Sequence, residues 1–428
     1  MSAGPALPAA HQPAPWLVRR VFPLLGTVGL IFLGMAGTIW GPRYYGHTAW
    51  AVPDDLWATM VAAQRILHLD LAGLYTLPTN LVSFPGTAVI LLPVVVIMDA
   101  AGLPLRAGPQ GPHPGEWLLV GPGEVIISAV ALFAADAIAE RLGASRPKRF
   151  VLAAASATAL WNVSVRWGHP EDAVAVGLLM YAVLALSGAR TSRAAWLAGA
   201  AVAVQPLVLL AFPVLVGAVE PRRLPGFVGR AASPSVLLLA LAAAANWTAT
   251  FHAVTSQPNA PTVDHPTPWI YLAPHLSGGS VAAGPARALT IAVACGCGLA
   301  IWWRWRAARL TAKWSPEILQ DVLWWIAVAL ALRSVFEPVM VSYYVWPPLA
   351  VALAAASPDW LRLVPTGAAA TGLTFLSQIW WRNPWAWWTP IITVLGLTLL
   401  LAYPRSARST AAQVLPEPGQ EFVAGGAP

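Results

Sequence analysis

Charged residues are scarce in this chain of 428 residues. Asp, Glu, Lys and Arg make up only 10% of it, and lysine occurs just twice, at Lys148 and Lys313. Hydrophobic residues make up 57%, and the mean hydropathy is +0.63. This composition excludes an ordinary soluble domain. Several apolar runs are long enough to cross about 30 Å of hydrocarbon. The sequence therefore predicts an all-α polytopic membrane protein.

Cysteine is almost absent as well. Cys295 and Cys297 lie in one apolar run, 291–303. Near neighbours inside a helix are poorly placed for a disulfide bond, so we expect both to be small packing residues. The formal charge of +7 and the pI near 9.8 would suggest nucleic acid in a soluble protein. In a membrane protein they indicate basic loops that face anionic lipid, and no nucleic-acid partner is expected.

The basic residues predict the orientation, because Lys and Arg stay on the cytoplasmic side. The first apolar span, Val21 to Trp40, follows Arg19 and Arg20 and so runs from inside to outside. About twelve crossings are expected, two of them half-helices within Ala194 to Val219 that turn outside at Gln205-Pro206. The other crossings are 117–139, 150–165, 173–188, 233–251, 286–303, 318–332, 341–356, 362–381 and 386–403. This scheme puts 18 of the 25 cations inside; the remaining seven are Arg43, Arg65, Arg106, Arg166, Arg287, Arg333 and Arg382.

One apolar stretch, 84–103, is interrupted by prolines and is expected to lie along or dip into the external interface. If it crossed, the cations between residues 141 and 149 would lie outside. The expected organisation is thus one membrane domain, 16–403, with an external loop, 41–116, that carries juxtamembrane helices. Residues 1–15 and the tail, 404–428, have compositions typical of disorder.

Residues that are hard to explain as packing collect in the predicted external loops. Asp54 and Asp55 follow the first span by about a dozen residues and are the candidate catalytic pair. The candidates for substrate or phosphate binding are Arg166, His169, Glu171, Asp172, Gln205, Arg333, Glu337, Tyr343, Tyr344 and Arg382. Arginines hold phosphate and a carboxylate acts as a base, so this set suits an anionic lipid-linked substrate.

Simpler interpretations compete at several of these positions. The sole role of Asp54 could be to cap a helix over 55–71. Asp55 would then point about 100° away from Asp54 around the helix axis. The sole role of Glu171 and Asp172 could be to stabilise a helix that starts there, through their interaction with its dipole. A divalent metal held by His169, Glu171 and Asp172 is a further alternative, although HExxH-type spacing is absent.

The later candidates and the intramembrane acids also have structural alternatives. Arg333 and Glu337 could form an i,i+4 ion pair. Tyr343 and Tyr344 could be interfacial anchors. Glu124 and Asp136 fall inside the second expected crossing, where acids are usually paired or functional, and Asp136 lies near enough to the inner end to snorkel.

The layout resembles the GT-C superfamily of glycosyltransferases that use polyprenyl-phosphate-linked sugars. The matching stretches are Asp54-Asp55, Ala62 to Tyr75, Phe84-Pro85, Gly168 to Ala173, Ala198 to Pro213, and Arg333 to Pro347. The actinobacterial envelope mannosyl- and arabinosyltransferases are the most similar group. The chain departs from the pattern at Gln205, where a lysine is common, and at Phe84-Pro85-Gly86, where a Tyr-Pro-Pro-like sequence is common.

The resemblance implies a GT-C-like helical bundle in the plasma membrane with its active site outside. It implies a polyprenyl-phosphate sugar donor, a glycan or glycolipid acceptor, and a catalytic aspartate at Asp54 or Asp55. The resemblance implies no certain cofactor, and a divalent metal held by His169, Glu171 and Asp172 stays an alternative. A transporter or flippase of a polyprenyl lipid or small solute is the alternative, because broken helices and membrane acids also mark transporters.

Overall fold

The computed structural model describes residues 16–45, 49–50, 54–76, 81, 83–105, 114–255, 259, 261–262, 264–305, 314–379, 381 and 383–404. The side chains at 44, 45, 54 and 114–116 fall outside this description. Two expectations therefore lie outside the described residues: disorder over 1–15 and disorder over the tail beyond Pro404.

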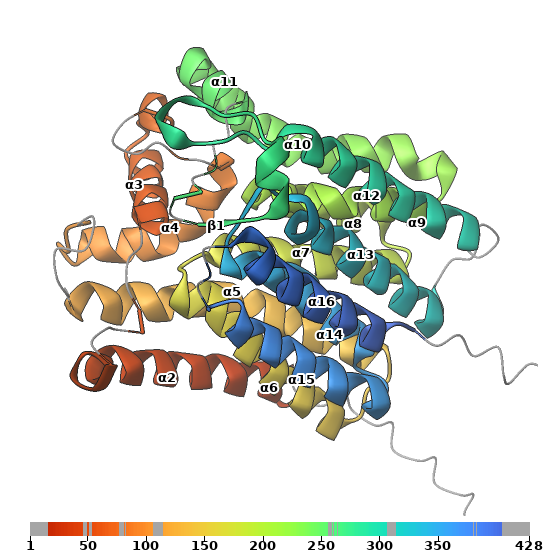
Figure 1. Cartoon of the computed structure of the whole chain (residues 1–428). Helices are drawn as coiled ribbons and strands as arrows, with labels where there is room; N and C mark the ends of the chain where they lie inside the picture. The colour runs from red at the N-terminus through yellow and green to blue at the C-terminus, as the bar shows by residue number, and fades with distance from the viewer. Residues whose placement is uncertain are drawn as a thin grey trace, which may run out of the picture.

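The described residues are almost entirely helical (Figure 1). The long helices are α2 (Val21–Tyr45), α3 (Asp54–Leu67), α4 (Pro85–Ala100), α5 (Pro114–Arg141), α6 (Arg146–Trp161), α7 (Pro170–Ser187), α8 (Thr191–Val204), α10 (Leu224–Ala245), α12 (Gly284–Arg304), α13 (Pro316–Phe336), α14 (Trp346–Ala356), α15 (Trp360–Leu376) and α16 (Pro384–Ala402). The short elements are α1 (Trp16–Arg19), η1 (Leu71–Gly73), η2 (Asn162–Arg166), η3 (Pro206–Ala211), α9 (Phe212–Ala218), η4 (Pro221–Arg223), α11 (Trp247–Thr255), η5 (Pro268–Leu272), η6 (Ser277–Gly279) and η8 (Ser342–Val345). One pair of two-residue strands, β1 (His265–Pro266) and β2 (Val339–Met340), is antiparallel.

Seven of the described helices are long and apolar enough to cross a membrane, so the chain is an all-α polytopic membrane protein. These candidate spans are Val21–Arg43, Trp117–Arg141, Pro170–Ser187, Pro221–Ala245, Gly284–Arg304, Pro316–Phe336 and Pro384–Ala402. Three further predicted crossings correspond to the shorter helices α6, α14 and α15, which have 16, 11 and 17 residues. The figure of about twelve crossings stays a prediction.

Three predicted spans have clearly different bounds in the structure, and one of them is 362–381, whose helix α15 ends at Leu376. Residues 341–345 were expected to be helical, but Ser342–Val345 is a 3₁₀ turn after strand β2, and α14 starts only at Trp346 with Pro347 in its first turn. The span 233–251 is interrupted at Asn246, which ends α10 in an extended conformation before α11 begins. Periodic apolarity alone does not show such breaks, because apolar residues continue through them.

The predicted half-helix turn is confirmed at Gln205-Pro206. Gln205 ends α8 with φ −144° and ψ 111°, and Pro206 opens the short helix η3, which leads into α9. A proline removes a backbone donor and pushes the residue before it into an extended conformation, so the helix must stop there. The beginning of α4 packs on this break: the Thr87 hydroxyl donates to the carbonyl of Val204 at 2.5 Å.

Helix α4 forms over most of the stretch that was expected to be interfacial or re-entrant. It has 16 residues, or about 24 Å at about 1.5 Å per residue, which is short of a full bilayer core. Gly86, near its start, touches the carbonyl of Ala203 so closely that any side chain there would clash. Helix α4 also packs on α3, so the two helices form one unit beside the end of α8.

The core of the bundle is formed by α7 and α14, while α10 is mostly exposed. In the candidate spans, 83% of α7 but only 17% of α10 is buried within the protein. Every residue of α14 is buried. We use two names below: the site end contains the start of α7 and the end of α8, and the turn end contains the α7–α8 connection, 188–190. Figure 1 shows α3 and β1 toward the left of the bundle and α9 toward the right.

A buried ion-pair network ties α2, α5 and α6 together. Asp136 on α5 is only 2% exposed and accepts from Arg20 at 2.7 Å and from Arg149 at 2.6 and 2.7 Å. Arg20 also donates to Glu140 at 2.6 Å, and Arg19 reaches Glu140 at 3.1 Å. Asp136 is therefore paired inside the protein and does not snorkel. The two arginines that were expected to orient the first span also fasten it to its neighbours.

Candidate functional site

The start of α7 forms the centre of the candidate site. The chain enters it through a π-helical turn, η2, and Gly168, whose φ of +62° is in the region that glycine adopts without strain. His169 follows as the N-cap and Pro170 is the first helical residue, a position that proline favours. Glu171 and Asp172 lie in the first turn, where the helix dipole favours them. Both acids are buried, so they are more than a solvated helix start.

His169 connects three segments of the chain. Its Nδ1 lies 2.7 Å from Oε1 of Glu171, and its Nε2 lies 3.9 Å from Oδ2 of Asp55 on α3. Its ring stacks on Tyr343 with centroids 3.9 Å apart. Burial lowers the pKa of His169, but the carboxylates of Glu171, Asp172 and Asp55 outweigh burial and raise the pKa above its usual value. His169 therefore keeps its proton more readily than a histidine in water.

Asp172 is fully buried and joins α7 to the break in α8. Its Oδ1 accepts from the side-chain amide of Gln205 at 2.8 Å, while its Oδ2 has no hydrogen-bond partner among the described residues. Arg333, at the end of α13, interacts electrostatically with Asp172. Gln205 thus contacts the predicted acid directly.

The two tyrosines are buried in the site, so the interpretation of Tyr343 and Tyr344 as interfacial anchors is wrong. They are 8% and 9% exposed, and their rings meet edge to face at 5.0 Å. The guanidinium of Arg333 lies 3.5 Å from the ring centroid of Tyr344, within cation–π range. Because Tyr343 stacks on His169, the two tyrosines connect the arginine to the histidine.

The predicted i,i+4 ion pair between Arg333 and Glu337 is not formed. Glu337 instead lies 3.7 Å from Arg287 at the start of α12. The reason is local: α13 ends at Phe336, and Glu337 has extended backbone angles, so the i,i+4 spacing of a helix does not apply. Arg333 and Glu337 still interact electrostatically at longer range.

Asp264, which was absent from the expected site, also lies here, and His265 follows it in the chain. Strand β1 pairs with β2, with His265 opposite Met340, and this places Asp264 near Asp55 and His169, with which it interacts electrostatically. His265 stacks on Trp387 of α16 with centroids 4.0 Å apart. An acid next to a histidine in an expected external loop was the available signal. The strand pairing that brings Asp264 to the site involves only two residues on each strand, which is too short to be recognised from the sequence.

We refer to these residues as the α7 cluster. It comprises Asp55, His169, Glu171, Asp172, Gln205, Asp264, Arg333, Tyr343 and Tyr344. Its members come from α3, the start of α7, the end of α8, the β1 segment, α13 and η8. Glu124 of α5 adjoins it: this acid is 2% exposed, has one oxygen without a hydrogen-bond partner among the described residues, and interacts with Glu171.

Four predicted site residues are not members of the cluster: Glu337, which pairs with Arg287, and three others. Arg166 is exposed at the end of η2, and no hydrogen bond or ion pair connects it to the cluster in the described part of the chain. Asp54 begins α3, but its carboxylate lies outside the described atoms, as does Arg382 altogether. Of the two adjacent aspartates, Asp55 is the one whose contact with His169 is described.

The metal alternative at His169, Glu171 and Asp172 is not supported by the geometry. Within the described ranges, no three His, Cys, Asp or Glu side chains are placed to hold a metal ion. The Nδ1 atom of His169 faces Glu171, and the Oδ1 atom of Asp172 faces Gln205, so these three side chains do not converge on a point.

Asp264 gives the cluster an expected pH dependence. Burial, together with the charge of Asp55, raises the pKa of Asp264 to about 6. A raised folded-state pKa stabilises the fold below the unfolded value near 4, and this stabilisation is lost as pH rises through about 6. Asp264→Asn should therefore melt at a higher temperature than the wild type at pH 7.5, with a clearly smaller difference at pH 4.5. Thermal unfolding in detergent at both pH values measures this, and a pH-independent difference would contradict it.

The cluster combines an accessible carboxylate with two buried acids and a partly buried guanidinium, that of Arg333. The side chain of Asp55 is 64% exposed, whereas Glu171 and Asp172 are shielded from solvent. Such an arrangement can accept a proton at the surface and hold an anionic group beside a fixed guanidinium.

Comparison with known proteins finds no relative of this chain: no protein-family model, no curated protein and no solved structure matches it.

Proposed function

We propose that the chain is a membrane glycosyltransferase that moves a sugar from a polyprenyl-phosphate donor to a glycan or glycolipid acceptor. The observation that carries the proposal is the α7 cluster itself, in which Asp55 lies beside His169 and the rings of Tyr343 and Tyr344 connect His169 to Arg333. These residues come from distant parts of the chain. The resemblance to the GT-C pattern supports the same function. The positive-inside rule supports an orientation with this end facing outside. The plasma-membrane location follows from the GT-C resemblance and is part of the proposal.

Asp55 is the proposed general base. It accepts the proton of the acceptor hydroxyl, the hydroxyl oxygen forms a bond to the anomeric carbon, and the bond from that carbon to the phosphate oxygen breaks. Polyprenyl phosphate leaves with the electron pair of that bond. Direct displacement of this kind inverts the anomeric centre. His169, 3.9 Å from Asp55 and fixed by Glu171 and Tyr343, positions the carboxylate.

Arg333 is the proposed partner of the leaving phosphate. Its guanidinium is held on the face of Tyr344 and carries a charge that Asp172 and Glu337 balance only at a distance. Guanidinium groups form strong charge-assisted hydrogen bonds to phosphate. Gln205, held against Asp172, replaces the lysine of the family pattern, so Arg333 supplies the positive charge that the glutamine lacks.

The test is product formation by the purified chain in lipid vesicles. Polyprenyl-phosphate mannose and polyprenyl-phosphate arabinose would each be offered with envelope glycan acceptors, and products would be analysed by mass spectrometry. We expect a glycosylated acceptor and free polyprenyl phosphate in equal amounts, with inverted anomeric configuration. Hydrolysis or absence of turnover with every donor, in protein that remains folded, would contradict the proposal.

A transporter or flippase is the second candidate, and the break in α8 favours it. Discontinuous helices whose ends face a polar site are typical of transporters, and Gln205 ends α8 directly against Asp172. The two functions separate in one vesicle assay with a fluorescent polyprenyl lipid. Movement of the lipid between leaflets without transfer of its sugar would support the transporter. Transfer without movement would support the enzyme.

A further inference from the structure

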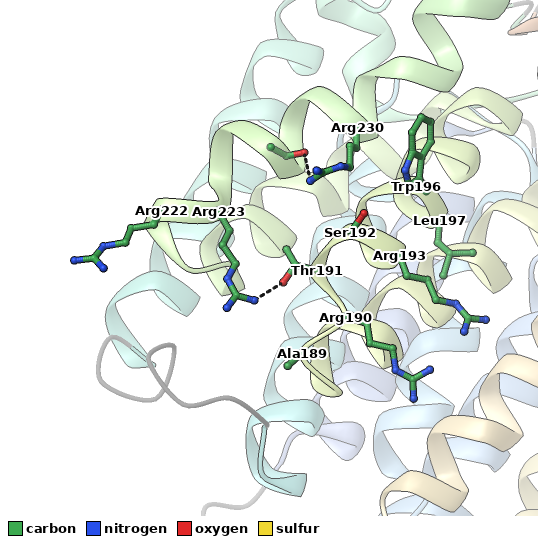
Figure 2. Close-up of a pocket in the computed structure, with 11 residues that line it drawn as sticks. Ala189, Arg190, Thr191, Ser192, Arg193, Trp196, Leu197, Arg222, Arg223 and Arg230 are labelled. Carbon is green, nitrogen blue, oxygen red and sulfur yellow. Dashed lines mark hydrogen bonds between the residues drawn. The ribbon is translucent and has the colours of Figure 1, made fainter.

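A basic pocket lies at the turn end of the bundle, away from the α7 cluster. The helix between them, α7, has 18 residues and is about 27 Å long, close to the thickness of a bilayer core. The pocket is an open cavity of about 1050 Å³ between the start of α8 and the start of α10 (Figure 2). Five arginines line it, together with Trp196: Arg190, Arg193, Arg222, Arg223 and Arg230.

The charge of this pocket is weakly compensated. No acid is among its lining residues, and one of its arginines, Arg223, pairs with Glu220 at 3.0 Å. Arg223 also donates to the Thr191 hydroxyl at 3.4 Å, and Arg230 donates to a backbone carbonyl of its own helix. Within the described ranges, Arg190 and Arg193 have no carboxylate within ion-pair distance. Figure 2 shows Arg222 extending away from the other four arginines.

The positions of these arginines are unfavourable for the helices themselves. Arg190 is the N-cap of α8, Arg193 lies in its first turn, and Arg223 is the N-cap of α10. Cations at helix N-termini oppose the macrodipole, so stability of the helices does not account for them. An anion between the two helix starts would be favoured by the guanidiniums and by the dipoles together.

The wall of the pocket continues as an apolar stripe along α10. Gly226 and Arg230 line the pocket, and Leu237 and Leu241 follow Arg230 by seven and eleven residues, which places all four on one side of the helix. Leu237 and Leu241 are 60% and 48% exposed. Trp196, 49% exposed, lines the pocket as well, and tryptophan is enriched at membrane interfaces.

We propose that this pocket binds the headgroup of an anionic phospholipid of the leaflet at the turn end, with its acyl chains along Leu237 and Leu241. Basic pockets between membrane helices are suited to acidic lipid headgroups. The apolar stripe distinguishes a lipid from a free anion, because inorganic phosphate would use the arginines but not the leucines. The proposal does not depend on the function of the α7 cluster, which lies at the opposite end of α7.

The test measures thermal unfolding of the purified chain in a neutral detergent with three probes at equal phosphate concentration: dioctanoyl phosphatidylglycerol, dioctanoyl phosphatidylcholine and inorganic phosphate. A ligand that binds only the folded state raises the melting temperature. We expect a rise with phosphatidylglycerol alone. The double variant Arg193→Gln/Arg230→Gln should need at least tenfold more phosphatidylglycerol for the same rise. The charge-matched control Arg141→Gln/Arg146→Gln, which removes two exposed arginines outside the pocket, should respond like the wild type.

Two further variants keep the result interpretable. Arg190→Gln/Arg193→Gln removes a second pair from the same pocket, and Leu237→Ser/Leu241→Ser alters only the stripe; both should also weaken the response to phosphatidylglycerol. Equal responses of the pocket variants and the control would overturn the proposal. So would a response to inorganic phosphate as large as that to phosphatidylglycerol, since that result would assign the pocket to a free anion.

Discussion

Asp55→Asn is expected to reduce glycosyl transfer by about 10²–10⁴-fold, the range that general-base assistance typically contributes. Asparagine has nearly the same shape as aspartate, but its amide cannot accept the proton of the acceptor hydroxyl. The side chain at this position is 64% exposed, and its described partner is His169 at 3.9 Å. Folding should therefore be little affected, and the loss should fall on kcat more than on the KM for the donor.

The measurement is initial rates with the donor that the vesicle assay identifies. Asp99→Asn, the same chemical change at an exposed position at the end of α4, is the matched control and should retain wild-type rates. Asp54→Asn should be measured in parallel, because the two aspartates are adjacent and both are candidates for the base. Full activity of Asp55→Asn with loss in Asp54→Asn would move the base to Asp54, and full activity of both would remove the proposed mechanism.

His169 offers an independent check on the same mechanism. Its pKa is raised by the carboxylates around it, Asp55 included, so removing the charge of Asp55 should lower it. The imidazole resonances of His169 should then titrate at lower pH in Asp55→Asn than in the wild type. A structural role for Asp55 that did not involve this contact would leave the titration unchanged.

The parts of the site that sequence predicted are those set by local rules. The start of α7 follows from His169-Pro170-Glu171-Asp172, since proline at the first position and acids in the first turn favour a helix there. The break at Gln205-Pro206 follows from the geometry of proline. Each of these features needs only neighbouring residues, so a single sequence suffices.

The parts that sequence missed depend on contacts between distant segments. Asp264 lies in the cluster because strand β1 pairs with strand β2 over two residues. Arg333 contacts the ring of Tyr344 and does not pair with Glu337, because α13 ends between the two charged residues. Spacing along the chain does not contain that information. The basic pocket was missed for a similar reason: its arginines were counted only as markers of orientation, and the fold brings two basic loops together.

The inner ion-pair network gives the largest expected effect on stability. Asp136→Asn should lower the free energy of unfolding by about 3–5 kcal/mol, the usual cost of removing one partner of a buried ion pair. Asp136 accepts two hydrogen bonds from Arg149 and one from Arg20, and both arginines are at most 10% exposed at their side chains. The substitution would leave two buried guanidiniums with Glu140 as their remaining acid.

Thermal unfolding in detergent measures the loss, with the exposed Asp99→Asn again as the matched control. A double-mutant cycle then separates pairing from packing. Arg149→Met should cost less in the Asp136→Asn background than in the wild type, because the arginine is already uncompensated there. Equal costs in both backgrounds would show that Asp136 and Arg149 are not energetically coupled. In that case α2, α5 and α6 would be held together by apolar packing, and Arg20 would serve only to orient the first span.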